Sequence, residues 1–177
     1  MRLLRTLALA FGAATFAVQA QAPASEAEAK AKFAVTLARF VQWPAGTLAT
    51  EGAPLRLCVL QDSPAVAAAF AGQRGVLVGG HPLGISLAGP GTPLPATGCD
   101  LLFVDGSAAR PYAGSAPAGD APVLTIGALD GFLSRGGMVE LVNVNDALRF
   151  DVNLKALRGA HLGLSSQVLK LARQVRE

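Results

Sequence analysis

The sequence has few of the residues with which proteins catalyse reactions or hold metal ions. Its 177 residues include two cysteines, two histidines, one tryptophan and one tyrosine. His81 and His161 are not spaced as in a zinc-binding H-E-x-x-H helix, and Cys58 and Cys99 are not spaced as in a redox C-x-x-C motif. The glycine-rich segments match neither phosphate-binding nor dinucleotide-binding loops, and no G-x-S-x-G elbow is present. We therefore expect no enzymatic activity, no cofactor and no metal site.

Charged residues are also scarce. They make up 15% of the chain, with 15 Lys and Arg against 12 Asp and Glu, and they form no basic block. This composition argues against nucleic acid as a partner. The apolar content of 51% excludes a disordered chain. After the N-terminus, every apolar run is interrupted by a charge, Gly or Pro before it reaches the roughly 20 residues that span a membrane.

The N-terminus has the layout of a cleaved signal peptide. Arg2 and Arg5 precede an uncharged apolar run from Leu7 to Val18, which is followed by small residues suited to cleavage after Ala20. Cleavage after Ala22 fits the same rule, and a buried N-terminal helix or an uncleaved anchor is the alternative. Loss of residues 1–20 leaves 13 basic and 12 acidic residues, a net charge of +1. We therefore expect a periplasmic protein.

The 157 residues from 21 to 177 are long enough for one domain with its own core. In an oxidising compartment, Cys58 and Cys99 indicate a disulfide. Such a bond would close a loop of about 40 residues, for which chain entropy gives a stabilisation of about 4 kcal/mol. Two buried free thiols are the alternative.

A helix is predicted to begin after Ser25, because Ser25 and Glu28 have the spacing of a capping box. Apolar residues then recur at helical spacing as far as Trp43, and Pro44 ends the pattern. The predicted buried face of this helix is made of Phe33, Leu37, Phe40 and Val41.

Short apolar runs bounded by Gly and Pro alternate with short helical segments in the rest of the chain. This alternation predicts an α/β fold, in which helices flank a mostly parallel central sheet. A hairpin at one edge and a C-terminal helix complete the prediction. The predicted strands are 55–60, 76–78, 83–87, 101–104 and 123–126, the hairpin strands are 138–142 and 147–152, and the helices are 65–70, capped by Ser63, and one from Ser165 or Ser166 to Arg173.

Five polar or aromatic residues are candidates for binding a partner or ligand. Arginines within apolar stretches either pair internally or present the guanidinium to an anion or a partner. A tryptophan at the end of a helix suits both the edge of a core and an interface. The candidates are Arg39, Trp43, Arg149, Arg158 and His161, of which the last three could instead hold an anionic small molecule.

Two groups of motifs, in the order in which they occur along the chain, resemble the signature motifs of the YfiR family. The first is the opening helix with its Phe, Phe and Trp-Pro positions, and the second is a C-terminal set of Gly-Phe, Gly-Gly-Met, Leu-Arg-Phe and Leu-Ser-Ser motifs. The residues are Lys32, Phe33, Phe40 to Pro44, Gly131-Phe132, Gly136 to Val142, Leu148 to Leu154 and Leu164 to Leu169, with 57–60 and 99–104 between them.

The resemblance implies a small periplasmic α/β domain that binds the periplasmic sensor region of an inner-membrane diguanylate cyclase, or of a sensor kinase, and represses it. Cyclic di-GMP and biofilm formation would then rise when the repressor is lost. An outer-membrane lipoprotein and a second copy of the chain are further candidate partners. The resemblance also implies a disulfide between Cys58 and Cys99. A second cysteine pair found in some members is absent here, where Leu133 and Ser134 occupy the corresponding turn.

Overall fold

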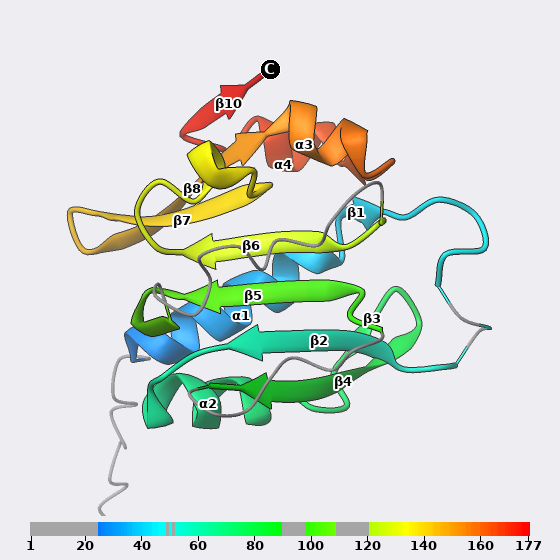
Figure 1. The fold of residues 1–177 in the computed structure, drawn as a ribbon, viewed down its shortest axis with the longest axis horizontal. Helices are drawn as coiled ribbons and strands as arrows, with labels where there is room; N and C mark the ends of the chain where they lie inside the picture. Colours follow the sequence, from blue (N-terminus) through cyan, green and yellow to red (C-terminus); the bar gives the residue numbers. More distant parts are fainter. Residues whose placement is uncertain (1–24, 49, 51, 90–97, 109–120) are drawn as a thin grey trace, which may run out of the picture.

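An eight-stranded, mostly parallel sheet forms the centre of the molecule (Figure 1). The computed structural model describes residues 25–48, 50, 52–89, 98–108 and 121–177. The predicted signal peptide, residues 1–20, lies outside these residues. None of the described helices combines the length and apolar character required to cross a membrane.

The strand order is β10-β8-β7-β6-β5-β2-β4-β3. Neighbours are parallel except for the β7–β8 and β3–β4 pairs. This arrangement confirms the predicted α/β class. The strands are β2 (Leu55–Leu60), β3 (Leu77–Val78), β4 (His81–Ala88), β5 (Leu101–Asp105), β6 (Leu124–Ala128), β7 (Val139–Val144), β8 (Ala147–Asn153) and β10 (Gln174–Arg176), while β1 (Val41–Gln42) and β9 (Gly163–Leu164) form a separate pair.

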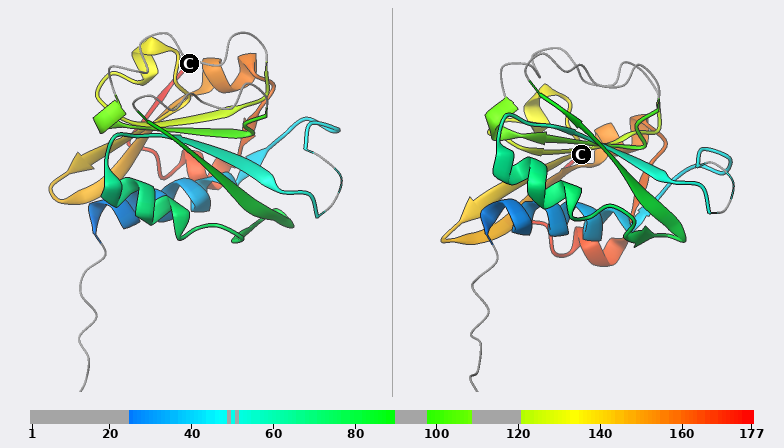
Figure 2. Two further views of the ribbon diagram at one scale, coloured as in Figure 1. Left: turned by 60° about the horizontal axis from the view of Figure 1, so that its bottom comes forward. Right: turned by 90° about the horizontal axis from the view of Figure 1, so that it is seen from below.

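The two faces of the sheet are covered differently (Figure 2). Helices α1 (Glu26–Ala38), α2 (Pro64–Ala71) and α4 (Ser166–Leu169) lie on one face, over the larger hydrophobic core. The short 3-10 helices η1 (Gly106–Ala108) and η2 (Leu133–Arg135) lie on the other face, with a smaller apolar cluster that includes Phe132 and Cys58.

Helix α1 begins as predicted but ends earlier. The Ser25 hydroxyl accepts a hydrogen bond from the Glu28 amide at 3.2 Å, which confirms the N-cap. The helix stops at Ala38 because the chain then forms β1, which pairs antiparallel with β9. The prediction that the helix reaches Trp43 is therefore wrong. Phe40 was also placed wrongly, since it is 41% exposed and lies in the turn that precedes β1.

The C-terminal hairpin is confirmed, and its two-residue turn has Asn145 and Asp146 at φ values of 50° and 59°, as two-residue hairpin turns require. The predicted long final helix is wrong. Helix α4 is four residues long, and the Arg173 amide donates to the carbonyl of Phe150, which starts the pairing of β10 with β8. The hairpin therefore lies one strand in from the edge. A helix that was not predicted, α3 (Leu154–Gly159), follows β8 with Asn153 as its N-cap.

The predicted disulfide is confirmed, since Cys58 of β2 is bonded to Cys99 just before β5, with Cα atoms 5.7 Å apart. An ion pair reinforces this link. The Asp100 carboxylate accepts hydrogen bonds from the Arg56 backbone amide at 2.8 Å and from its guanidinium Nη2 at 2.9 Å. The disulfide and the ion pair therefore tie neighbouring parallel strands together at the same place.

We predict that changing both Cys58 and Cys99 to Ser lowers the free energy of unfolding by about 4 kcal/mol, because the bond closes a loop across a sequence separation of 41 residues. Urea denaturation followed by circular dichroism measures the loss. Reductant should destabilise the original chain and leave the double variant unchanged. Equal stability of the disulfide-bonded original chain and the double variant would contradict a stabilising disulfide.

Candidate functional site

Side chains from the segment between Leu37 and Trp43 line two separate hollows on the surface. Leu37 and Phe40 line a narrow apolar groove. Arg39 and Trp43 line a larger cavity. The two hollows share no lining residue, because the chain turns from helix α1 into strand β1 between them.

The apolar groove has a volume of about 120 Å³ and is formed by helix α1, strand β8 and the segment that begins with α4. The rings of Phe33 and Phe150 meet in it with centroids 5.3 Å apart. Its rim is exposed, since Leu171 is 73% and Phe40 41% accessible to solvent. The groove residues are Phe33, Thr36, Leu37, Phe40, Phe150, Val168 and Leu171.

Exposed apolar side chains that adjoin one another around a groove are typical of an interaction surface, whereas scattered ones are ordinary. Phe40 and Leu171 adjoin in this way across the groove. Leu77, 62% exposed, lies instead on β3 at the opposite edge of the sheet. The sequence did not reveal this surface, because Phe40 had the spacing of a buried helix position.

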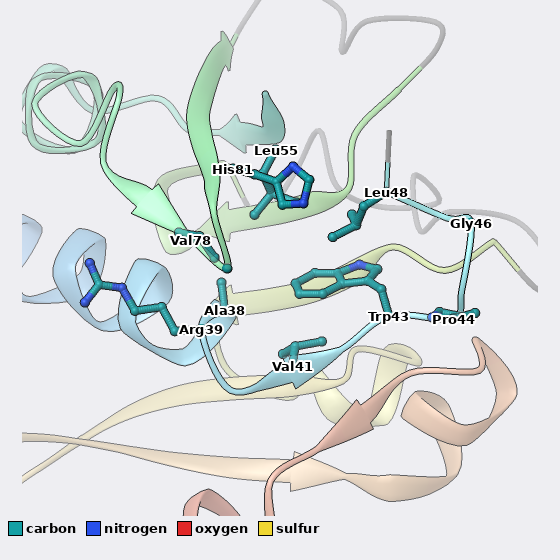
Figure 3. A pocket seen from close by; sticks show the side chains of 11 residues that line it. Ala38, Arg39, Val41, Trp43, Pro44, Gly46, Leu48, Leu55, Val78 and His81 are labelled. Atoms are coloured by element: carbon teal, nitrogen blue, oxygen red, sulfur yellow. The ribbon is translucent and has the colours of Figure 1, made fainter. Parts of the chain in front are cut away.

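The cavity beside Trp43 has a volume of about 370 Å³ and lies near the amino ends of β2 and β4 (Figure 3). Figure 3 shows the indole ring between Val41 on one side and the Leu48 and His81 side chains on the other. The indole Nε1 is buried and has no hydrogen-bond partner among the described residues. An unpaired buried donor of this kind costs about 1–3 kcal/mol. No signal in the sequence indicated that His81 would line this cavity.

Of the five predicted contact residues, the structure brings Arg39 and Trp43 to the same cavity. Arg149 is exposed on β8, and strand alternation turns it to the opposite sheet face from Phe150. Arg158 is exposed on α3, with its Nη2 3.9 Å from Glu177 Oε1, and His161 is exposed just beyond that helix. Neither these two residues nor Arg149 lines the groove or the cavity.

Sheets of this kind usually bind ligands at the carboxyl ends of their parallel strands. At the end of β5, internal hydrogen bonds and ion pairs engage Asp105. The Ser107 hydroxyl donates to Asp105 Oδ2 at 2.6 Å, and Lys30 Nζ lies 3.3 Å from Asp105 Oδ1 and 2.8 Å from Glu26 Oε1. Burial acts to raise the pKa of Asp105, but the hydrogen bonds from Ser107 and the charge of Lys30 outweigh it and hold that pKa below its usual value. Burial likewise acts to lower the pKa of Lys30, and its carboxylate partners raise it above the usual value.

Metal ligands do not gather in the part of the chain that the structure describes: no three His, Cys, Asp or Glu side chains lie close enough to hold an ion.

The model of the YfiR/HmsC-like family matches residues 27–173. The matched range contains every residue that lines the groove and the cavity. None of the curated proteins compared with the chain matches it. The family resemblance seen in the sequence motifs is thereby confirmed.

We predict that Asp105→Asn lowers the free energy of unfolding by about 1.5–3 kcal/mol near neutral pH, the usual contribution of charged hydrogen bonds. Because the folded pKa of Asp105 is depressed, its stabilising charge is present above about pH 4, the unfolded value, and is lost as the pH falls through the folded pKa. Urea denaturation at about pH 7 and about pH 2.5 should therefore show that the difference in free energy of unfolding between the original chain and Asp105→Asn is smaller in acid. Asp62→Asn, an exposed carboxylate at the same edge, is the control and should have little effect at either pH. A difference in free energy of unfolding that stays constant with pH would contradict a stabilising role for the charge of Asp105.

Proposed function

We propose that this chain, which belongs to the YfiR/HmsC-like family, binds the periplasmic region of an inner-membrane diguanylate cyclase and holds that enzyme inactive. The family is one of periplasmic, non-catalytic regulators of diguanylate cyclases. Repression by this chain would lower cyclic di-GMP. The observation that carries the proposal is the exposed apolar groove between Phe40 and Leu171.

The groove suits a protein partner because covering its apolar side chains would contribute favourable free energy to binding. Covering a Phe or Leu side chain contributes about 1.5–3 kcal/mol, so Phe40 and Leu171 together could dominate the binding energy. The groove between them accepts an apolar side chain of the partner, which would contact Phe33 and Phe150. A polar rim around such a centre is typical of regulatory interfaces.

Arg39 lines the cavity and not the groove, but it is the predicted contact residue next to Phe40 in the chain. It is exposed and directly precedes Phe40, so it can meet an acidic group of the partner at the rim of the groove. Arg149, Arg158 and His161 stay predictions that this interface does not require. A sensor kinase as the target, an outer-membrane lipoprotein and a second copy of the chain also stay predictions.

We predict that Phe40→Ser and Leu171→Ser each weaken capture of the cyclase about tenfold or more, since each removes a buried apolar contact worth well over 1 kcal/mol. The measurement is a pull-down from solubilised membranes with the protein from Gln21 to Glu177, followed by mass spectrometry for a membrane protein that carries a cyclase domain. Leu77→Ser is the matched control, because the 62% exposure of Leu77 lies between those of Phe40 and Leu171 and Leu77 is at the far edge of the sheet.

The same three variants are expressed in cells that lack the original gene, and cyclic di-GMP is measured. Phe40→Ser and Leu171→Ser should leave cyclic di-GMP high, as in the deletion strain, whereas Leu77→Ser should restore the low level. Full repression by both groove variants would contradict the proposed interface. A deletion strain with unchanged cyclic di-GMP would contradict the repressor function itself.

A further inference from the structure

The cavity beside Trp43 contains a hydrogen-bond donor that the described fold leaves unused. The indole Nε1 is shielded from water and meets no acceptor in the described part of the chain. A tryptophan ring of this size packs equally well when its N–H is bonded, and buried indoles usually have a partner. The unmet donor therefore points to an acceptor that is supplied by another molecule.

The same cavity offers an acceptor. His81 Nδ1 lies 2.9 Å from the carbonyl oxygen of Ala53, and because that oxygen can only accept, Nδ1 carries the proton. In the neutral ring, Nε2 is then an acceptor, and no residue that the structure describes bonds to it. His81, which also lines the cavity, thus carries a free acceptor alongside the unused donor of Trp43.

Four apolar side chains share the cavity wall with Trp43 and His81, and Arg39, Gly46 and Gly79 also line it. Val41, Leu48, Leu55 and Val78 line the cavity around the indole ring. The Arg39 guanidinium points away from the indole in Figure 3, so the centre of the cavity has no cation aimed into it. The lining therefore favours an uncharged ligand over an anion.

We propose that this cavity binds a secondary amide attached to an aliphatic group, with its carbonyl accepting from Trp43 Nε1 and its N–H donating to His81 Nε2. A secondary amide has one donor and one acceptor, which is the complement of this pair of groups. The cavity of about 370 Å³ lies within the range of small-molecule sites. Short apolar peptides and small free amides share this chemistry. The site lies apart from the apolar groove and does not depend on the proposed repression of a cyclase.

Leu48 controls access to the indole N–H. Its side chain lies over the nitrogen-bearing edge of the ring in Figure 3, and the chain just before it turns at Gly46 with φ 78°. A ligand carbonyl reaches Nε1 when the Leu48 side chain moves aside and packs against the aliphatic part of the ligand. Binding thus replaces an unpaired buried donor with a bonded one at the cost of one side-chain rearrangement.

The chain contains one tryptophan, so its fluorescence and its indole N–H resonance report on this cavity alone. The test titrates N-isobutylacetamide into the protein from Gln21 to Glu177, to about 100 mM, because a ligand of so few atoms is expected to bind in the millimolar range. The expected result is a saturable change in Trp43 emission and a shift of the single indole N–H resonance. Isobutyl acetate, which has the same shape without the N–H, should bind about fivefold more weakly or worse.

Two variants separate the proposed contacts from the fold. His81→Asn keeps a donor toward Ala53 and removes Nε2, so it should abolish the preference for the amide over the ester. Trp43→Phe keeps a ring and removes the donor, and should weaken amide binding about fivefold, as followed by the backbone amide resonances of Val78 and Gly79. Thermal unfolding of both variants checks that they remain folded.

The blocked dipeptide N-acetyl-Leu-Ala-methylamide distinguishes the two sources of the amide. Binding about tenfold tighter than that of N-isobutylacetamide supports a peptide segment as the occupant, and equal binding supports a small free amide. An unchanged indole resonance over the whole titration would overturn the proposal. Equal binding of the amide and the ester to the original chain would overturn it as well.

Discussion

The positions of the groove and the cavity depend on the short antiparallel pairing of β1 with β9, which joins two pairs of residues. Val41 pairs with Leu164 and Gln42 with Gly163, and the Ser165 amide donates to the Phe40 carbonyl at 3.1 Å. This ladder takes over the backbone groups that a longer helix would have used, so α1 ends at Ala38. Phe40 consequently stands at the rim of the apolar groove, and the chain carries Trp43 to the cavity on the other side.

The parallel strands provide the rigid support behind both hollows. Strands β2, β5 and β6 are buried along most of their length, and the disulfide and the Arg56–Asp100 pair join β2 to the start of β5. At the carboxyl end of β5, Lys30 of α1 pairs with Asp105. The hollows therefore lie where helix α1, the short strands and the C-terminal segment meet, at positions that are set by irregular connections and not by the sheet.

Local signals were sufficient for most of the sheet and for the beginnings of helices. The Ser25 capping box and the Ser63-Pro64 start predicted α1 and α2, and uninterrupted apolar runs predicted β2 and β5, because these patterns act within a few residues. The β1–β9 and β8–β10 pairs join segments distant in sequence, which periodicity cannot reveal. For the same reason Phe40 was assigned to a buried helix face. The roles of the five predicted contact residues stay predictions. Arg39 and Trp43 line one cavity with His81, and Leu171 lines the groove with Phe40; both groupings arise only in the folded chain.

In the proposed complex, Phe40 faces a membrane diguanylate cyclase and the opposite edge of the sheet does not. A photo-reactive benzophenone side chain at position 40, irradiated in living cells, tests this contact at the level of one residue. We expect a crosslink from position 40 to an inner-membrane protein with a cyclase domain, and none from the same side chain at position 77. A crosslink to the cyclase from position 77 without one from position 40 would contradict this arrangement.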